Sequence, residues 1–415
     1  MTGIDLLRRI AQPGDGKIVL LILDGLGDLR TRHQPRTALE TARTPNLDAL
    51  AAAGALGRIV PVAQGVTPGS GPGHLALFGY DPTSEEADIG RGALEALGVG
   101  VDFGPGDVVA RGNFATLDAD GKVADRRAGR ISTEENRRIV ARLGQALERA
   151  AGEGRIRDLA VSVHPGEGHR FVLLLKGPEL SPAIADTDPQ EVGAPPAALE
   201  ARDEAARGTV ERLAPALRVM AEALRDEPRA NGYLLRGFDT LPHLPTLAEL
   251  YGLTAGCFAG YPLYRGAARL SGMELVDCGK AFGELVEGAR RRWRDFDYLF
   301  LHVKDPDKAG EDGDLEAKAR ALEAVDERLP ELVGLLDEER DVIAVTGDHS
   351  TPAPMRAHSW HPVPLLLHAP ASAFVDEATE FTEAAAARGT LGTFPARELM
   401  GLLLAHAGRL AKYGA

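Results

Sequence analysis

The sequence is poor in cysteine, contains no long apolar run and has few aromatic residues. Its two cysteines, Cys257 and Cys278, are too few for the disulfide framework of a secreted protein, so a cytoplasmic location is expected. No stretch of about 18 apolar residues occurs, so no transmembrane helix is expected. Residues 1–16 lack the continuous apolar core of a signal peptide. Hydrophobic residues still make up 44% of the chain, which is enough for a globular core.

Basic residues are fewer than acidic residues, 47 against 61. The formal net charge is −14 at pH 7. This balance argues against nucleic acid or a membrane surface as a partner, because both favour a basic face. A small anionic substrate is still compatible with it, since one pocket can be basic in an acidic protein.

Four short apolar runs alternate with helical patterns, and their continuity is typical of strands buried on both faces of a parallel sheet. The runs lie at 17–28, 296–307, 340–350 and 361–370. Helical patterns, notably at 44–57 and 314–339, lie between them. Strands that alternate with helices predict an α/β fold with a mostly parallel sheet flanked by helices.

The middle of the chain has a different pattern. From about residue 101 to 236, short apolar runs are separated by turns and by a segment rich in Pro, Ala and Asp at 178–196. Two long helical patterns accompany them. We therefore predict a smaller inserted α+β domain at 101–236, within a discontinuous main domain formed by 1–100 and 237–415.

Three of the apolar runs end in carboxylates. Ligands of α/β sheets bind at the carboxyl ends of strands, so Asp24, Asp307 and Asp348 are expected at one edge. Each alone has an ordinary explanation, because an aspartate after a strand is most often a helix cap. Together they predict a site for two divalent metal ions.

Further oxygen and imidazole ligands accompany these aspartates. Glu311 follows Asp307 by one helical turn, so both side chains would point the same way. His349 adjoins Asp348, and the segment "AHSWHP" adds His358 and His361. Carboxylates suit Mg²⁺ and Mn²⁺, whereas imidazole is accepted by Mn²⁺ and Zn²⁺.

Ser70 stands among glycines in "GVTPGSGPGHLALFGYDP" at 65–82. The glycines either form a loop that brings a reactive serine to an anion or make a tight surface turn. A nucleotide loop is less favoured, because the Gly-Lys-Ser/Thr ending and the dinucleotide spacing are missing. A serine hydroxyl is a weak nucleophile unless a base or a metal activates it. A metal beside Asp24 would allow Ser70 to take part in phosphoryl transfer.

With these residues assembled, the sequence resembles the archaeal-type 2,3-bisphosphoglycerate-independent phosphoglycerate mutases of the alkaline phosphatase superfamily. The matching segments keep the family order from about residue 17 to 367. They include "LLILDGLGD", "TPNLDALAAAG", "GRGALEALGVG", "RRAGRIS", "LLRGFDTLPHLPTLAELYGL", "YPLYRGAARLSGM", "HVKDPDKAGEDGD" and "VTGDHSTP…AHSWHPVPLLL".

The resemblance implies an alkaline-phosphatase-like sheet and the interconversion of 3-phosphoglycerate and 2-phosphoglycerate, a step of glycolysis and gluconeogenesis. Ser70 would form a phosphoserine intermediate. One metal would be held by Asp24, Ser70, Asp348 and His349, and the other by Asp307, Glu311 and His358. Glu311 stands where superfamily members often have His, which favours Mn²⁺ or Mg²⁺ over Zn²⁺.

The resemblance also implies that the inserted domain holds the phosphorylated substrate by its carboxylate and hydroxyls. Arginine suits this role because it binds carboxylates and phosphates through two parallel hydrogen bonds. A surface arginine is usually only solvated, and that interpretation stays open for each candidate. The candidates are Arg91, Arg111, Arg126, Arg127, Arg130, Arg236 and Arg265.

One segment departs from the family pattern, and the pattern assigns no role to one histidine, His361. Gly71-Pro72-Gly73 follows Ser70 where many relatives have an aspartate directly after the serine, so specificity or rate could differ. His361 could support a ligand or simply pack.

The alternative function is a phosphatase or phosphomutase for another phosphorylated metabolite. A non-catalytic metal- or phosphate-binding protein is the third hypothesis.

Overall fold

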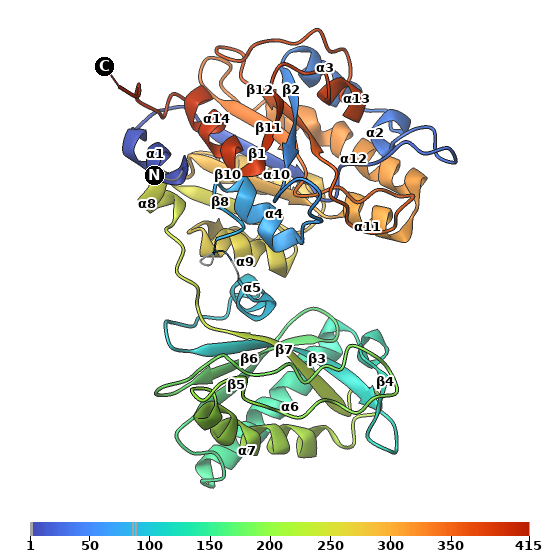
Figure 1. The fold of residues 1–415 in the computed structure, drawn as a ribbon, viewed down its shortest axis with the longest axis vertical. Coiled ribbons are helices and arrows are strands. Elements are labelled where there is room, and N and C mark those ends of the chain that lie inside the picture. The colour runs from blue at the N-terminus through green and yellow to red at the C-terminus, as the bar shows by residue number, and fades with distance from the viewer. Residues whose placement is uncertain (1–2, 85–86, 88, 415) are drawn as a thin grey trace. The chain divides into compact units, whose positions relative to one another are not determined.

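The chain folds into two compact units in the computed structural model, which describes residues 3–84, 87 and 89–414 (Figure 1). The first unit is built from Met1–Asp88 and Leu244–Ala415, and the second from Ile89–His243. Helix α5 (Arg91–Gly98) therefore belongs to the second unit, whereas the sequence analysis placed these residues in the main domain.

An eight-stranded, mostly parallel sheet forms the centre of the first unit, which confirms the predicted α/β architecture. Its order is β13-β2-β12-β11-β1-β10-β8-β9, and β12 is the one described strand antiparallel to its neighbours. The four predicted apolar runs are β1, β10, β11 and β12. The strand bounds are β1 (Ile18–Leu23), β2 (Ala55–Val60), β8 (Ala255–Ala259), β9 (Glu274–Leu275), β10 (Tyr298–Val303), β11 (Val342–Thr346), β12 (Val363–His368) and β13 (Gly392–Pro395).

The central strands end together at one edge of this sheet. Strands β1, β10 and β11 are buried at every position, as expected for strands covered on both faces. Leu23 of β1 pairs with Val303 of β10, and Ile22 pairs with Thr346 of β11, all in parallel. The residues that follow these three strands therefore emerge next to one another.

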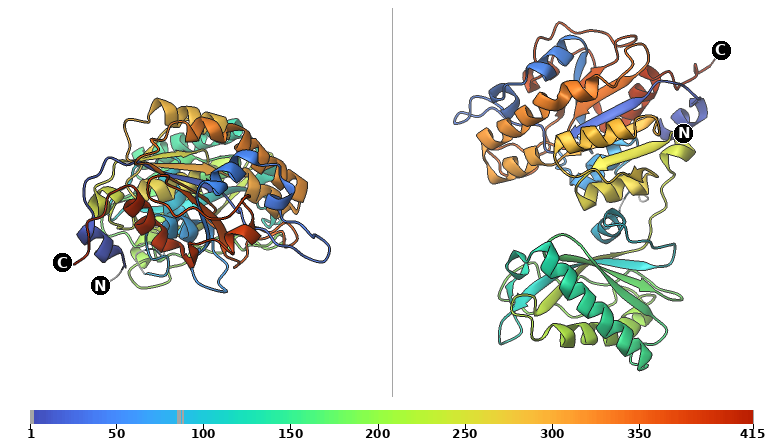
Figure 2. Two further views of the ribbon diagram at one scale, coloured as in Figure 1. Left: turned by 90° about the horizontal axis from the view of Figure 1, so that it is seen from above. Right: turned by 180° about the vertical axis from the view of Figure 1, so that it is seen from behind.

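Helices cover both faces of the sheet (Figures 1 and 2). Helix α12 contacts α2, α3 and α10 in one layer, and α4, α9 and α14 lie in the other. The bounds are α1 (Gly3–Ile10), α2 (Ala38–Thr41), α3 (Pro45–Ala52), α4 (Ser70–Leu77), α8 (Leu247–Tyr251), α9 (Pro262–Leu270), α10 (Phe282–Arg291), α11 (Asp305–Asp312), α12 (Leu315–Val333), α13 (Glu383–Ala386) and α14 (Leu399–His406).

Two local signals fix the junction between α11 and α12. Gly313 ends α11 in the left-handed region at φ 74°, where glycine is least strained. Asp314 then caps α12, since its Oδ1 accepts the backbone N–H of Ala317 at 2.8 Å. The chain therefore turns at once, and α11 packs against α12 beside the carboxyl edge of the sheet.

The second unit is an antiparallel sheet with two long helices. Helices α6 (Thr133–Gly152) and α7 (Arg207–Leu224) pack over a core that includes Phe114 and Phe171. Helix α5 contacts β3 and β7. The strand bounds are β3 (Val108–Leu117), β4 (Val123–Asp125), β5 (Ala160–Pro165), β6 (Arg170–Lys176) and β7 (Gly232–Asp239).

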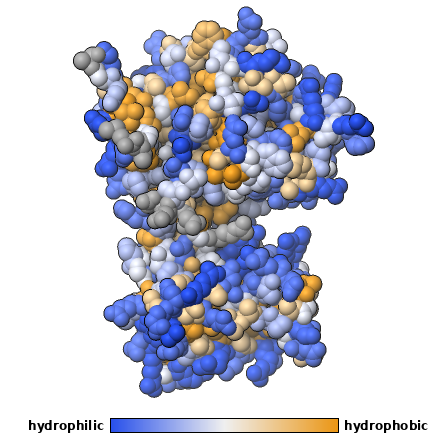
Figure 3. All heavy atoms as spheres, in the orientation of Figure 1, coloured by the Kyte–Doolittle hydropathy of each residue, from blue (hydrophilic) through white to orange (hydrophobic). Residues whose placement is uncertain are grey.

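The molecular surface is largely hydrophilic on the face that Figure 3 shows, with apolar residues in small scattered groups. Among the described residues, no helix combines the length and the apolar character needed to span a bilayer.

Candidate metal centre

The ends of β1 and β11 bring three ligand-type side chains together. Asp24 directly follows β1, and Asp348 and His349 follow β11; all three are fully buried. Oδ1 of Asp24 lies 3.2 Å from Nε2 of His349, and Oδ2 of Asp348 lies 3.4 Å from the same nitrogen. This spacing would let the three side chains hold one metal ion.

A second group adjoins the first and shares His349. Asp307 lies in the first turn of α11, and its Oδ1 is 3.9 Å from Nε2 of His349 and 3.6 Å from Nε2 of His358. The two imidazole rings stack with centroids 3.7 Å apart. His349 thus borders both groups, whereas the resemblance assigned it to one metal only.

The two remaining predicted ligands lie differently. Glu311 is one turn beyond Asp307, with Oε1 3.9 Å from Nε2 of His358, but its side chain is 55% exposed. It borders the second group from the solvent side. His361 joins neither group among the described residues: its Nδ1 lies 3.0 Å from Oγ of Ser359, and its ring stacks on Trp360.

Ser70 is the first residue of α4, and its hydroxyl reaches the first group. Its Oγ lies 3.5 Å from Nε2 of His349. The helix can approach this closely because Gly73 has no side chain: a Cβ there would lie 2.4 Å from the carbonyl oxygen of Asp348. The glycine-rich segment therefore begins helix α4 at Ser70, and the hydroxyl of Ser70 lies beside the first group of ligands.

Lys304 places a positive charge between the two groups. Its Nζ donates hydrogen bonds to Oδ2 of Asp24 at 2.9 Å, to Oδ2 of Asp307 at 2.5 Å and to Oη of Tyr264 at 2.7 Å. Although burial opposes protonation, the charges of Asp24 and Asp307 raise the pKa of Lys304 above its usual range. The sequence analysis missed this residue, although its place directly after β10 was a usable signal.

Two buried histidines support the carboxylates. Nε2 of His302, in β10, lies 3.3 Å from Oδ2 of Asp24, and Nδ1 of His74, in α4, lies 3.3 Å from Oδ2 of Asp348. Both rings stack on Tyr264, with centroids 3.9 and 4.7 Å from its ring. The sequence analysis missed both, because each histidine stands inside an apolar segment that also suits a packed core residue.

The charges of this cluster stabilise one another. Burial disfavours an ionised Asp24, yet the nearby imidazoles of His302 and His349, at 3.3 and 3.2 Å, and the charge of Lys304 hold its pKa well below the usual range. Burial likewise opposes protonation of His349, but Asp348 and Asp24 raise its pKa to about 9. Asp24 is therefore ionised at neutral pH, as a metal-binding carboxylate must be.

The donor atoms of the cluster fit divalent metal ions. Within the described residues, neither carboxylate oxygen of Asp348 has a hydrogen-bond partner, nor does Oδ1 of Asp24, although all three are buried. Leaving buried carboxylate oxygens unpaired is costly unless a cation binds them. Carboxylates combined with imidazoles form a donor set that Mn²⁺ and Zn²⁺ accept.

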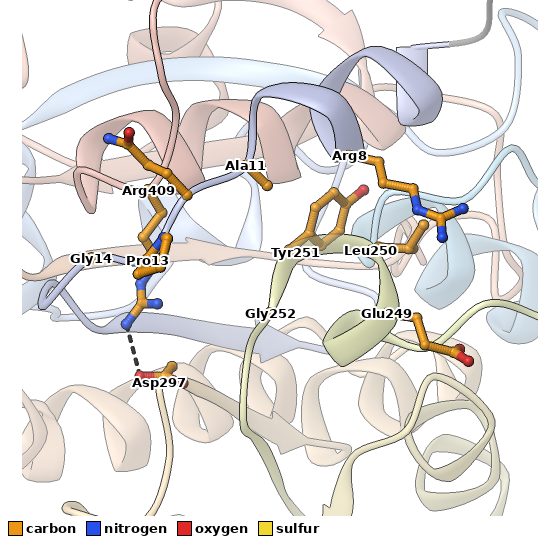
Figure 4. Close-up of a pocket in the computed structure, with 11 residues that line it drawn as sticks. Arg8, Ala11, Pro13, Gly14, Glu249, Leu250, Tyr251, Gly252, Asp297 and Arg409 are labelled. Atoms are coloured by element: carbon orange, nitrogen blue, oxygen red, sulfur yellow. Dashed lines mark hydrogen bonds and ion pairs between the residues drawn. The ribbon is translucent and has the colours of Figure 1, made fainter.

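A cavity of about 500 Å³ lies at the opposite edge of the same sheet (Figure 4). It is lined by residues that precede the strands, including Gly14 before β1 and Asp297 before β10. Nη2 of Arg409 donates to Oδ1 of Asp297 at 2.7 Å, an ion pair that ties the C-terminal segment to the sheet. Ligands of parallel sheets bind at the carboxyl ends of the strands, so this cavity is not the expected site.

The sheet of the second unit carries arginines on the face opposite its helical core. Arg111 of β3 alternates with core residues and pairs across strands with Arg236 of β7. Arg170 of β6 is the cross-strand partner of Asn113, two residues along the same face. Acidic side chains lie beside this face, since Nε of Arg236 is 3.8 Å from Oδ2 of Asp186. Burial and the charges of Arg170, Arg111 and Arg127 lower the pKa of His169 to about 4.

The other predicted arginines have varied surroundings. Arg126 pairs with Asp188 through two hydrogen bonds of 3.0 and 2.8 Å, and Nη1 of Arg236 lies 3.5 Å from the same carboxylate. Nη1 of Arg265, in α9, donates to the carbonyl oxygen of Ala259 at 3.1 Å. The side chain of Arg91 lies outside the described part of the chain. Two others are exposed, Arg127 and Arg130.

Comparisons with known proteins agree with this arrangement. A profile of the family described as 2,3-bisphosphoglycerate-independent phosphoglycerate mutase matches residues 51–230. A relative from Thermus thermophilus, named a probable 2,3-bisphosphoglycerate-independent phosphoglycerate mutase, is 49% identical over 412 residues, 99% of this chain and 98% of the relative.

Two solved structures resemble the whole chain. A protein from Pyrococcus horikoshii aligns with a TM-score of 0.80 at 29% identity, covering 98% of this chain and 100% of that one. A cofactor-independent phosphoglycerate mutase from Thermoplasma acidophilum aligns with a TM-score of 0.70 at 29% identity, covering 95% of this chain and 100% of that one.

Proposed function

Because the chain belongs to the 2,3-bisphosphoglycerate-independent phosphoglycerate mutase family, we propose that Ser70 carries the phosphoryl group during the reaction. The reaction is the interconversion of 3-phosphoglycerate and 2-phosphoglycerate, which makes the protein an isomerase. One observation supports the role of Ser70 most directly: its Oγ lies 3.5 Å from Nε2 of His349, beside Asp24 and Asp348.

Two sets of residues would hold two divalent metal ions. Asp24, Ser70, Asp348 and His349 form one proposed set, and Asp307, Glu311 and His358 form the other. When bound, such ions polarise the phosphoryl oxygens and stabilise the attacking and leaving oxygens of an in-line displacement. Mn²⁺ or Mg²⁺ is proposed over Zn²⁺, because Glu311 supplies a hard oxygen ligand.

The reaction has two chemical steps: Oγ of Ser70 accepts the phosphoryl group in the first and gives it up in the second. Oγ loses its proton and forms a bond to phosphorus while the bond from phosphorus to O3 of the substrate breaks, and O3 takes up a proton. O2 of the retained glycerate then loses its proton and attacks the phosphoserine, the bond from phosphorus to Oγ breaks, Oγ takes up a proton, and 2-phosphoglycerate is released. His74 helps hold the start of α4 in place, since its Nδ1 lies 2.7 Å from the carbonyl oxygen of Ser70.

Arg111 and Arg236 are the best-supported residues for binding the substrate carboxylate. They stand opposite each other on β3 and β7, so one anion could accept hydrogen bonds from both, although Arg236 also lies 3.5 Å from Asp188 and 3.8 Å from Asp186. Arg170 and Asn113, which the sequence analysis did not select, lie on the same face. Arg126 is less available because Asp188 accepts two hydrogen bonds from it. The roles of four others rest on the resemblance alone, namely Arg91, Arg127, Arg130 and Arg265.

We also propose a cytoplasmic location. Its support is that both cysteines, Cys257 and Cys278, are free, as is usual in a reducing compartment.

One assay distinguishes this function from its alternatives. Metal-supplemented protein is incubated with 3-phosphoglycerate in the absence of 2,3-bisphosphoglycerate, and ³¹P NMR follows 2-phosphoglycerate and inorganic phosphate together. The proposal expects 2-phosphoglycerate without matching phosphate release. Phosphate release without the isomer would instead indicate a phosphatase, and no turnover would indicate a binding protein. Rapid acid quenching and peptide mass spectrometry should locate phosphate on Ser70.

A further inference from the structure

Thr351 links the two candidate metal groups through its hydroxyl. The residue is fully buried, and its Oγ1 donates to Oδ1 of Asp307 at 2.5 Å and lies 3.0 Å from Nδ1 of His349. A hydroxyl has a single hydrogen, and an ionised carboxylate can only accept. The contact with His349 therefore requires Nδ1–H as the donor. The hydrogen bonds run in one direction, from His349 through Thr351 to Asp307.

This direction determines which face of His349 is free to bind a metal. A histidine that binds a metal must be a neutral imidazole with one N–H, so in the metal-bound ring a hydrogen on Nδ1 leaves the lone pair on Nε2. Nε2 is the atom that lies 3.2 Å from Asp24 and 3.4 Å from Asp348. Metal-binding histidines usually donate their other N–H to an acceptor that fixes both the tautomer and the ring orientation.

Thr351 is itself held rigidly by the surrounding loops. Its backbone N–H donates to the carbonyl oxygen of Gly25 at 3.2 Å, and its carbonyl accepts from Nζ of Lys318 at 2.9 Å. Lys318 is fully buried and also donates to the carbonyls of Gly25 and Gly27, at 2.8 and 3.0 Å. The loops that follow β1 and β11 are therefore joined through one side chain of α12.

We propose that Thr351 is a positioning residue for both metal ions, which orients His349 on one side and Asp307 on the other. The proposal rests on the metal centre proposed above. Residues that touch a single group should affect the binding of one ion. Because the Thr351 hydroxyl contacts a member of each group, its loss should weaken the binding of both ions.

Isothermal titration with Mn²⁺ tests this after the protein has been stripped with a chelator. Thr351→Val keeps the branched shape without the hydroxyl, whereas Thr351→Ser keeps the hydroxyl without the methyl group. We expect Thr351→Val to weaken both binding steps by about 10- to 100-fold, and Thr351→Ser to stay within a few-fold of the wild type. Unchanged affinities in the valine variant, or the loss of only one step, would overturn the proposal.

Thr346→Val is the matched control. Thr346 is also fully buried, but its Oγ1 donates to the carbonyl oxygen of Pro364 at 2.7 Å, within the sheet. This variant should keep both Mn²⁺ affinities. If it loses them as well, the effect of Thr351→Val reflects the loss of any buried hydroxyl here, and the proposal is wrong.

A spectroscopic measurement does not depend on the valine variant folding. In Mg²⁺-loaded protein with ¹⁵N-labelled histidine, the Nδ1 proton of His349 should resonate downfield, as a hydrogen-bonded proton does, in the wild type and in Thr351→Ser. A resonance typical of a water-exposed imidazole would contradict the proposal. Failure of the wild type to bind two ions would count against the metal centre itself, which is a separate outcome.

Discussion

Gly73 packs so closely against Asp348 that a Cβ on the glycine would lie 2.4 Å from the carbonyl oxygen of the aspartate. A real Cβ does not approach a backbone atom within 3.0 Å. Gly73 is the third residue of Gly71-Pro72-Gly73, the segment in which the sequence analysis expects a departure from the family pattern. Gly73 itself has a steric role, because only glycine at this position lets α4 bring Ser70 to the candidate metal centre.

Gly73→Ala should therefore impair both activity and stability. The methyl group would push α4 away from Asp348 and move Ser70 with it. We expect a loss of about 1–3 kcal/mol in the free energy of unfolding and a marked fall in kcat. Gly144→Ala is the control, since no atom lies within 4 Å of a Cβ in that helix position. The control should be neutral or stabilised by up to about 1 kcal/mol; equal behaviour of the two variants would refute the steric argument.

Ser70→Ala should abolish turnover while the fold is kept. Without Oγ there is no acceptor for the phosphoryl group, so we expect kcat to fall by about three orders of magnitude or more. The coupled enolase assay measures the loss, and urea unfolding shows whether the fold is intact. Appreciable remaining activity in a folded variant would exclude the phosphoserine route.

Glu311→Ala should weaken one metal-binding step and leave the other nearly unchanged. Glu311 borders His358 at 3.9 Å and contacts no described member of the first group. Asp312→Ala, at the next exposed position of α11, is the matched control and should bind Mn²⁺ as the wild type does. Glu311→His should shift the preference from Mn²⁺ or Mg²⁺ towards Zn²⁺. If Glu311→Ala binds both ions normally, Glu311 is not a ligand.

Lys304→Met should destabilise the metal-free protein. The ammonium of Lys304 is the neutralising partner of two buried carboxylates, Asp24 and Asp307. Removing one partner of a buried ion pair leaves an uncompensated charge, so we expect a loss of about 3 kcal/mol in chelator. Mn²⁺ should restore more stability to the variant than it adds to the wild type, since the ion replaces the missing charge. Equal unfolding curves in chelator would contradict this.

Glu383 predicts a pH dependence of stability. Burial raises the pKa of Glu383 to about 7 in the folded protein, although Thr37 opposes the shift. The folded state therefore binds a proton more tightly than the unfolded state. This contribution is fully present below pH 4.5, the ordinary pKa, and is lost as the pH rises through about 7.

The comparison with Glu383→Gln isolates this effect. Between pH 5 and 8, the free energy of unfolding of the wild type should fall by about 2–3 kcal/mol relative to the glutamine variant. Glu380→Gln, at an exposed position nearby, should show no such divergence. Parallel pH profiles for the wild type and Glu383→Gln would show that this carboxyl keeps its ordinary pKa.

Local patterns were sufficient to predict the framework of the first unit. Strands β1, β10, β11 and β12 were recognisable because continuous apolar runs mark strands buried on both faces. Asp24, Asp307 and Asp348 could be placed at one edge because parallel strands end together. These predictions need only the sequence near each strand and a general rule about where α/β sheets bind ligands.

The missed residues depend on distances that no local pattern contains. Lys318 stands in an amphipathic helix where a solvated lysine is normal, yet it is fully buried and binds three carbonyl groups. His302 sits in an apolar strand, where a packed histidine is the usual interpretation. The shared position of His349 follows from ring stacking on His358, which only the folded loop defines.

The reversed direction of β12 has a consequence for how this protein can change. Because β12 starts beside the end of β11, the segment 347–362 begins and ends at the same edge of the sheet. It carries His349, Thr351 and His358, so a single deletion or insertion in it would move ligands of both ions at once. Evolution can vary the side chains exposed on this segment, such as Trp360, but its length should be among the most constrained properties of the chain.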